Sequence, residues 1–274
     1  GAAPGLRSAV SAMIAAVTPG MALTALSACA RTPSQARASA ASTLIERNTL
    51  PSLTVIGDST FASVKATPRG DITFAIVADA SGHGVPAAML TMAAKNVFSN
   101  LLAERISPAH AMASANHEIL KMIKTQDFMT GFLLKMYPSG LVEFSNAAHP
   151  SAFYQSRQGE IRLLDTSGFI LGGLDDVDAL YENGSVQMQA GDRLFLYTDG
   201  VIETANPANQ FFGMDRLEKM LRITRGLELS KVIPRIFSDM VHFSEGVAFR
   251  DVVGRGGVGD RQGRDVGRLA DGPA

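Results

Sequence analysis

The sequence predicts an α+β protein, in which helices and strands form separate layers. Strand-like segments outnumber helical ones, and the helical segments occur as neighbouring pairs. A doubly wound parallel sheet would require strands and helices in alternation, so layers of paired helices and antiparallel strands are favoured. The chain has 274 residues, of which 46% are hydrophobic, which is enough for one large domain with a substantial core.

Charge and cysteine content exclude several classes of function. The formal net charge is −1, and without a basic surface we expect no nucleic-acid partner. The single cysteine, Cys29, excludes a disulfide framework and a cluster of thiolate metal ligands.

An apolar segment opens the chain. No charged residue occurs between Ser8 and Ala30, and about 20 apolar residues suffice to cross a bilayer as a helix. Arg31 and Arg37 follow this segment, so the positive-inside rule would anchor a cytoplasmic domain at the inner face of the membrane. Pro19-Gly20 interrupts the segment and weakens this interpretation.

Two other interpretations of this segment remain open. Leu26-Ser27-Ala28-Cys29 resembles a lipoprotein cleavage box, and a buried or disordered helix is the third alternative. The domain organisation predicted on this basis has four parts. They are an apolar N-terminal segment (1–30), a polar linker (31–47), the main domain (48–253) and a tail (254–274).

The first half of the main domain contains two predicted strands and two predicted helices. A β-branched strand over 52–58 ends at a Gly-Asp turn, and a second strand covers 71–79. The unbroken apolar run of the second strand indicates burial on both faces. Apolar spacing predicts a helix over 85–105, and a second helix follows over about 108–125.

The second half contains mostly strands. Two of them, 128–137 and 140–148, are joined at a Pro-Ser-Gly turn. Short strands are expected at 152–154, 161–164, 185–188 and 193–198, and a final helix pair at 215–221 and 230–243.

Three aspartates lie at the ends of predicted strands. Asp58, Asp79 and Asp199 each neighbour a glycine or another small residue, where a carboxylate is exposed on a rigid element. Because no Cys or His cluster competes with them, these oxygen donors suit a hard cation such as Mg²⁺ or Mn²⁺. An acid beside a glycine is also common turn chemistry, so a purely structural role remains open for each.

Four motifs together resemble those of SpoIIE/RsbU-type (PPM-like) metal-dependent serine/threonine phosphatases. They appear in the family's order between residues 48 and 253. The matching segments are Gly57-Asp58-Ser59, ADASGHGVPAA from Ala78 to Ala88, SNAAHP from Ser145 to Pro150, and AGDRLFLYTDGVIE from Ala190 to Glu203, followed by Phe212-Gly213. Ala148 stands where the family's N-A-G-H-P segment has glycine.

The resemblance implies a fold and a metal site. The fold is a sandwich of two antiparallel sheets flanked by paired helices. The site holds two Mn²⁺ or Mg²⁺ ions, bridged by Asp79, with Ala80 supplying a backbone carbonyl and Asp58 and Asp199 supplying further carboxylates. Metal-activated water then attacks the phosphorus, so Asp58, Asp79 and Asp199 are the predicted catalytic residues.

The remaining motif residues are expected to support the site or the local structure. They are Gly57, Ser81, Gly82, His83, Gly84, Asn146, His149, Thr198 and Gly200. Ser81 lacks the preceding glycine of a G-x-S-x-G nucleophile. The Gly-His-Gly sequence lacks the lysine and the full glycine spacing of a phosphate-binding loop.

The C-terminus departs from the family pattern. Family members close with Asp-Asp-x-Thr, which supplies a metal ligand, and then a final core strand. Asp251 takes the place of the first acid and is the predicted fourth carboxylate, but Val252 and Gly254 replace the second acid and the threonine. Residues 254–274 are rich in Gly and Arg without apolar alternation. We therefore expect a disordered or aberrant tail and a sandwich without its last strand.

Three hypotheses of function follow. The resemblance implies a phosphoserine phosphatase acting on a phosphorylated STAS-type protein, an anti-sigma-factor antagonist, in a bacterial partner-switching pathway. The first alternative is a catalytically weak pseudophosphatase that binds its phosphoprotein as a regulatory module. The second, a periplasmic lipoprotein hydrolase, is favoured only by the sequence around Cys29.

Overall fold

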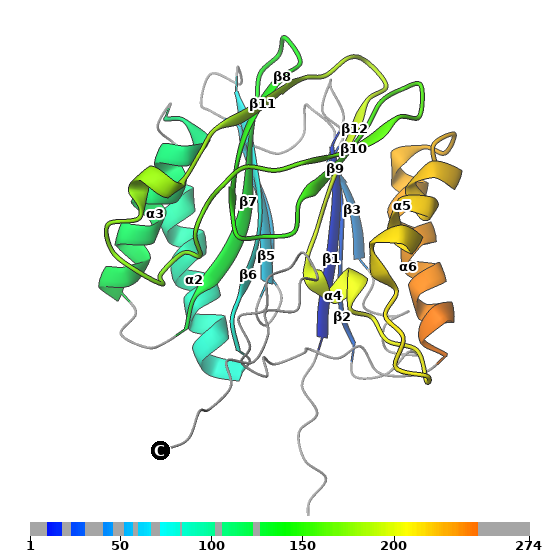
Figure 1. The fold of residues 1–274 in the computed structure, drawn as a ribbon, viewed down its shortest axis with the longest axis horizontal. Coiled ribbons are helices and arrows are strands. Elements are labelled where there is room, and N and C mark those ends of the chain that lie inside the picture. The colour runs from blue at the N-terminus through cyan, green and yellow to red at the C-terminus, as the bar shows by residue number, and fades with distance from the viewer. Residues whose placement is uncertain are drawn as a thin grey trace, which may run out of the picture.

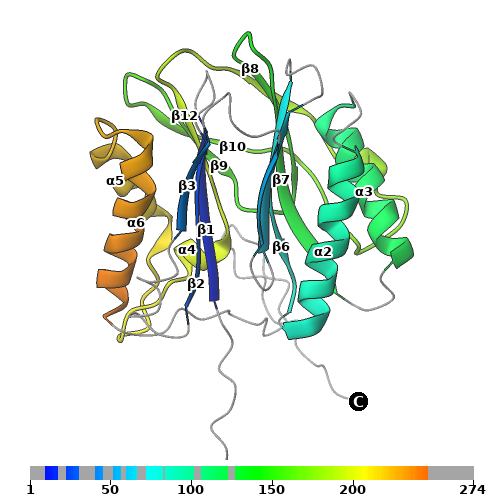
Figure 2. The same ribbon diagram turned by 180° about the vertical axis from the view of Figure 1, so that it is seen from behind.

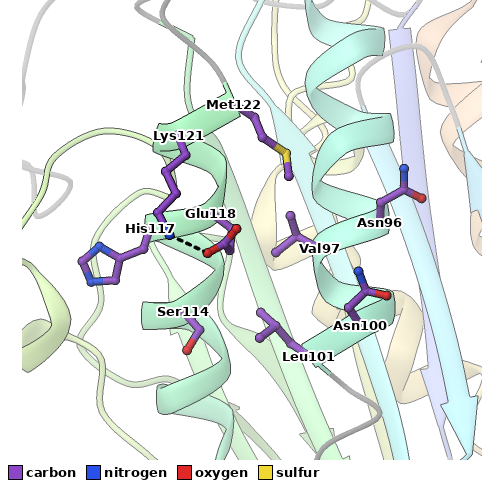
Figure 3. A pocket seen from close by; sticks show the side chains of 9 residues that line it. All are labelled: Asn96, Val97, Asn100, Leu101, Ser114, His117, Glu118, Lys121 and Met122. Carbon is purple, nitrogen blue, oxygen red and sulfur yellow. Dashed lines mark hydrogen bonds and ion pairs between the residues drawn. The ribbon is translucent and has the colours of Figure 1, made fainter.

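The computed structural model of the chain describes residues 10–17, 23–30, 41–45, 52–56, 60–66, 72–82, 84–101, 106–122 and 127–245, with side chains from residue 72 onward. Two antiparallel sheets of six strands each lie face to face, and a pair of helices covers each outer face (Figures 1 and 2). This is the predicted α+β sandwich.

The first sheet has the strand order β11-β8-β7-β6-β5-β4. Its strands are β4 (Ser52–Ile56), β5 (Thr60–Ala66), β6 (Thr73–Ala80), β7 (Met129–Met136), β8 (Leu141–Ala147) and β11 (Gly184–Gln187). The helices on its outer face are α2 (Gly84–Leu101) and α3 (Pro108–Met122). The central strand β6 is buried on both faces, as its continuous apolar run predicted.

The second sheet has the order β10-β9-β12-β1-β2-β3. Its strands are β1 (Val10–Val17), β2 (Leu23–Ala30), β3 (Ala41–Ile45), β9 (Ala152–Gln155), β10 (Ile161–Leu164) and β12 (Arg193–Tyr197). The helices α5 (Gly213–Ile223) and α6 (Leu229–Ser244) cover its outer face. Two short helices, η1 (Asp178–Leu180) and α4 (Asp199–Ile202), lie in the connections.

Side-chain alternation along the strands separates the core into three layers. In β6, Ala75 and Val77 belong to the cluster between the sheets, whereas Phe74 and Ile76 belong to the cluster under α2 and α3. In β12, Leu194 and Leu196 belong to the cluster between the sheets, whereas Phe195 and Tyr197 belong to the cluster under α5 and α6. The position of a residue in a strand therefore indicates which of these clusters its side chain faces.

The structure differs from the expectation for the N-terminal region. The apolar segment forms two paired strands, with Val10 opposite Ala30 and Val17 opposite Leu23, and β1 also pairs with β12. The expected membrane helix over this segment is therefore wrong for this fold, in which Val10–Val17 and Leu23–Ala30 are strands and Cys29 lies in β2. The physical reason is that Pro19-Gly20 divides the run into two halves, each too short to cross a bilayer as a helix.

The predicted domain boundaries change with this finding. Part of the expected linker, Ala41–Ile45, is strand β3 and pairs with β2, so the sandwich begins well before residue 48. In the parts of the chain that the structure describes, none of the helices combines the length and apolar character that crossing a bilayer requires. The predictions of a disordered tail over 254–274 and of a missing last strand concern residues outside the described part of the chain.

Candidate active site

The carboxylate of Asp79 is placed by the last residues of β6. Ala75 and Val77 face the other sheet, so Asp79, two residues further along the strand, faces the same way. Its side chain is half-buried, at the end of the sandwich where α2 begins (Figures 1 and 2). Ala80 follows with its methyl group packed under the helices.

The signature loop, which begins with Ser81-Gly82 directly after β6, is hydrogen-bonded to the residue that precedes β7. The backbone N–H of Ser81 donates to the Phe128 carbonyl, and the Ser81 hydroxyl accepts from the Phe128 N–H, both at 2.8 Å. Gly82 has φ +81°, a left-handed conformation that favours glycine. The hydroxyl of Ser81 thus continues the pairing of β6 and β7, which is a structural task.

A second carboxylate comes from the opposite sheet. Asp199 is exposed and is the first residue of α4, directly after the buried Thr198 at the end of β12. The carbonyl of Gly200 accepts the Thr204 hydroxyl at 2.8 Å, which fixes the short helix against the following loop. Val201 and Ile202 of α4 pack in the cluster under α5 and α6, and α4 contacts β1 and α5, so the short helix belongs to the layer on the outer side of the second sheet.

The turn after β8 is held by Asn146. Its side-chain oxygen accepts the His149 N–H, and its amide donates to the His149 carbonyl, both at 2.8 Å. The same amide donates to Asp165 Oδ1 at 2.6 Å. Asn146 is 3% exposed and His149 is 4% exposed, so this turn is part of the core. Asn146 and His149 therefore act first as structural residues of this end of the sheet.

Ala148, which replaces the family's glycine, lies in this turn with φ +53°. A left-handed conformation costs an L-residue about 1–2 kcal/mol, whereas glycine adopts it freely but loses about 0.5–1 kcal/mol more entropy on folding. We therefore expect Ala148→Gly to raise the free energy of unfolding by about 0.5–1 kcal/mol, measured by denaturant unfolding.

A matched control is available in the preceding residue. Ala147 is fully buried in β8 and has no positive φ, so Ala147→Gly should lower stability. A destabilised Ala148→Gly protein would contradict the assignment of strain to this position.

The predicted site residues fall into two groups, those that the structure describes and those that it does not. Asp79 and Ala80 are the last two residues of β6, and Asp199 is the first residue of α4; their carboxylate and carbonyl oxygens are donors of the kind that a hard divalent cation prefers. Gly57, Asp58, His83 and Asp251 lie outside the described residues. Within the described part of the chain, no three His, Cys, Asp or Glu side chains gather closely enough to hold a metal ion. Completion of the site would thus require donors such as Asp58 and Asp251.

Sequence reasoning missed two polar residues at this end of the sheet. Thr130 lies opposite Asp79 in the pairing of β6 with β7. Asp127 lies beside the signature loop, with Oδ1 within 3.6 Å of the position that a Cβ on Gly82 would take. The only sequence signal for either was the start of a strand at 128, because Thr130 is placed opposite Asp79 by strand pairing and Asp127 is placed near Gly82 by the folded chain.

Comparison with known proteins adds the family. Residues 69–253, about two thirds of the chain, match the family described as "Stage II sporulation protein E (SpoIIE)". The chain belongs to the SpoIIE family. One solved structure of similar fold is the SiaA-PP2C domain of Pseudomonas aeruginosa, with a TM-score of 0.63 and 23% identity; the match covers 73% of this chain and 81% of that one. Another is the PP2C phosphatase domain of SpoIIE from Bacillus subtilis with a fragment of its regulatory domain, with a TM-score of 0.53 and 14% identity; the match covers 87% of this chain and 60% of that one. The SpoIIE sandwich described above is thus a PP2C-type fold.

Two curated relatives of this SpoIIE-family chain come from Bacillus subtilis (strain 168). Phosphoserine phosphatase RsbP is 25% identical over 133 residues, which cover 47% of this chain and 32% of the relative. Phosphoserine phosphatase RsbU is 23% identical over 171 residues, which cover 62% and 50%. The match thus spans about a third of the length of RsbP and half of the length of RsbU.

Proposed function

We propose that this chain is a divalent-cation-dependent protein serine/threonine phosphatase. The observation that carries the proposal is the position of Asp79 in the last two residues of β6 and of Asp199 directly after β12, at the start of α4, in a PP2C-type sandwich. Membership of the SpoIIE family and the names of the phosphoserine phosphatase relatives support it.

The residues divide the work between holding cations and holding the site in shape. The Asp79 and Asp199 carboxylates and the Ala80 carbonyl would hold two Mn²⁺ or Mg²⁺ ions, with Asp58 and Asp251 as further donors. Such ions supply positive charge that neutralises phosphoryl oxygens and makes water acidic enough to act as the nucleophile. No side-chain nucleophile is then required, which agrees with the structural hydrogen bonds of the Ser81 hydroxyl.

The proposed substrate is a small phosphoprotein of the STAS type, an anti-sigma-factor antagonist in a partner-switching pathway. Support comes from the motif resemblance and from the two relatives, which are named phosphoserine phosphatases. Upstream regulation would then control the phosphorylation state of this protein and hence the availability of a sigma factor.

A second candidate is a regulatory module that binds a phosphoprotein but turns it over weakly. The observation that favours it is the C-terminal departure, where Val252 and Gly254 replace an acid and a threonine. Both candidates predict phosphoprotein binding, and only the first predicts efficient release of phosphate.

The experiment is a phosphate-release assay with EDTA-treated protein and a phosphoserine-bearing STAS-type protein. We expect Mn²⁺ or Mg²⁺ to restore turnover, and Zn²⁺, which prefers nitrogen and sulfur ligands and tetrahedral geometry, to bind without useful turnover. A metal-free protein that works at full rate would exclude the proposed mechanism. Binding without turnover at saturating Mn²⁺ would select the regulatory module.

A further inference from the structure

The hydroxyl of Thr130 lies on the same face of the sheet as the Asp79 carboxylate. Phe132 and Leu134 in β7 belong to the cluster between the sheets, so Thr130, two residues before Phe132, shares their face. In the pairing of β6 with β7, Thr130 is directly opposite Asp79. Cross-strand neighbours on one face have Cβ atoms about 4.5–5.5 Å apart, within reach of a hydroxyl and a carboxylate.

The Thr130 hydroxyl is in turn held by a buried imidazole. Thr130 Oγ1 and His149 Nδ1 are 2.9 Å apart, a hydrogen-bond distance. The backbone N–H and carbonyl of His149 are both bound by Asn146, and a bridge between Gly131 and Ala148 joins the turn to β7. The backbone of His149 is thus fixed relative to β7, and burial of the side chain favours the ring position in which Nδ1 meets the Thr130 hydroxyl.

This chain of contacts extends outward to the surface at Asp165. Asn146 donates to Asp165 Oδ1 at 2.6 Å, and the Ser151 hydroxyl donates to Asp165 Oδ2 at 2.6 Å. The order is thus Asp165, Asn146, His149, Thr130 and then the position of Asp79, from the surface toward the candidate site. Each member is oriented by the one before it.

We propose that Thr130 and His149 are positioning residues for the Asp79 carboxylate. His149 orients the Thr130 hydroxyl, whose remaining hydrogen-bonding capacity fixes the carboxylate oxygens for cation binding. Partners of this kind, one step removed from a metal ligand, change metal affinity by about 10–100-fold when they are removed. The inference rests on the proposed function, because it assigns Asp79 to a cation site.

Thr130→Val tests the pair, because valine keeps the shape of threonine and its preference for strands while removing the hydroxyl. We expect its Kd for Mn²⁺, measured by calorimetric titration of the full chain, to rise by about 10–100-fold. Thr130→Ser keeps the hydroxyl and should bind Mn²⁺ within about threefold of the unmodified chain, an estimate that assumes only the methyl contact is lost.

His149 supplies a second, independent variant. His149→Phe removes the nitrogen and should weaken Mn²⁺ binding as Thr130→Val does, whereas His149→Asn places an amide near Nδ1 and should retain most of the affinity. If the two residues act as one unit, the variant that carries both Thr130→Val and His149→Phe should bind Mn²⁺ no more weakly than the single variant with the larger loss. This result separates positioning from a general loss of packing, because independent losses of packing would add in the double variant.

Thr224 provides the matched control. Its hydroxyl is buried and donates to the carbonyl of Met220, in α5, at 2.7 Å. Helix α5 covers the outer face of the second sheet, whereas Asp79 and Thr130 lie in the first sheet. Thr224→Val removes a buried hydroxyl of the same kind and should leave the Kd for Mn²⁺ unchanged. Thermal unfolding of each metal-free variant verifies that it is folded before the titration.

Two outcomes would overturn the proposal. If Thr130→Val and His149→Phe are folded and bind Mn²⁺ within about twofold of the unmodified chain, far below the expected loss, the pair does not position Asp79. If the unmodified chain binds no Mn²⁺, the positioning role and the proposed function fail together.

Discussion

Asp79→Asn is expected to remove at least about 4 kcal/mol of transition-state stabilisation, which is roughly a thousandfold loss of rate. Under the proposed function the Asp79 carboxylate would help to hold both cations, and a neutral amide would not balance their charge. The half-buried setting between the sheets strengthens the effect, because charges interact more strongly away from bulk water. The measurement is kcat for phosphate release at saturating Mn²⁺.

The matched control for this variant is Asp239→Asn. Asp239 lies on α6 in an ion pair with Arg235 at 2.9 Å, and removing an exposed pair of this kind has little energetic effect. Its turnover should equal that of the unmodified chain. If Asp79→Asn keeps more than about a tenth of the normal turnover, well above the thousandfold loss, the two-cation assignment is wrong.

The second large effect is expected at Asp192, which is 2% exposed. Its carboxylate accepts hydrogen bonds from the N–H groups of Gln189 and Arg157, at 2.7 and 2.8 Å, and from the Tyr154 hydroxyl at 2.8 Å. Burial by itself would raise the pKa of Asp192, but these hydrogen bonds outweigh it and lower the pKa below the ordinary value of 3.8. Burial and the hydrogen bond to Asp192 raise the pKa of Tyr154 to about 12, so its hydroxyl remains a donor.

Asp192→Asn should therefore lower the free energy of unfolding by roughly 2 kcal/mol at neutral pH, the range for hydrogen bonds to a charged group. A lowered pKa in the folded state means that ionised Asp192 stabilises the fold above pH 3.8 and that this contribution is lost as the pH falls below it. The difference in free energy of unfolding between the unmodified chain and Asp192→Asn, measured with urea, should hence narrow below about pH 4. A difference that stays constant or widens there would contradict the role assigned to the carboxylate.

Much of the fold could be predicted from the sequence because its helices and central strands carry local signals. The helix expected over 85–105 occupies Gly84–Leu101, and the helix expected over 108–125 occupies Pro108–Met122. The strands β1 to β3 lack such signals, because Ala, Ser and Met fill them without polar alternation. What makes them strands is distant pairing, such as Ile14 opposite Tyr197, which no local window contains.

The candidate site divides in the same way. Asp79 and Asp199 could be found because each lies in a recognisable motif close to the end of a strand. Thr130 could not, since a single threonine in an apolar strand carries no signal until the register places it opposite Asp79. Strand β5 and helix α4 were also missed, the latter because Asp199-Gly200 was interpreted as a turn at the end of a strand.

The most direct measurement of the central claim is the binding of Mn²⁺, followed by electron paramagnetic resonance of the free ion. It requires no knowledge of the phosphoprotein substrate. If Asp79 and Asp199 together hold divalent cations at this end of the sandwich, the unmodified chain binds Mn²⁺ and each of Asp79→Asn and Asp199→Asn weakens binding by at least about tenfold. Unchanged affinity in both variants, with Asp239→Asn as the reference, would contradict the claim.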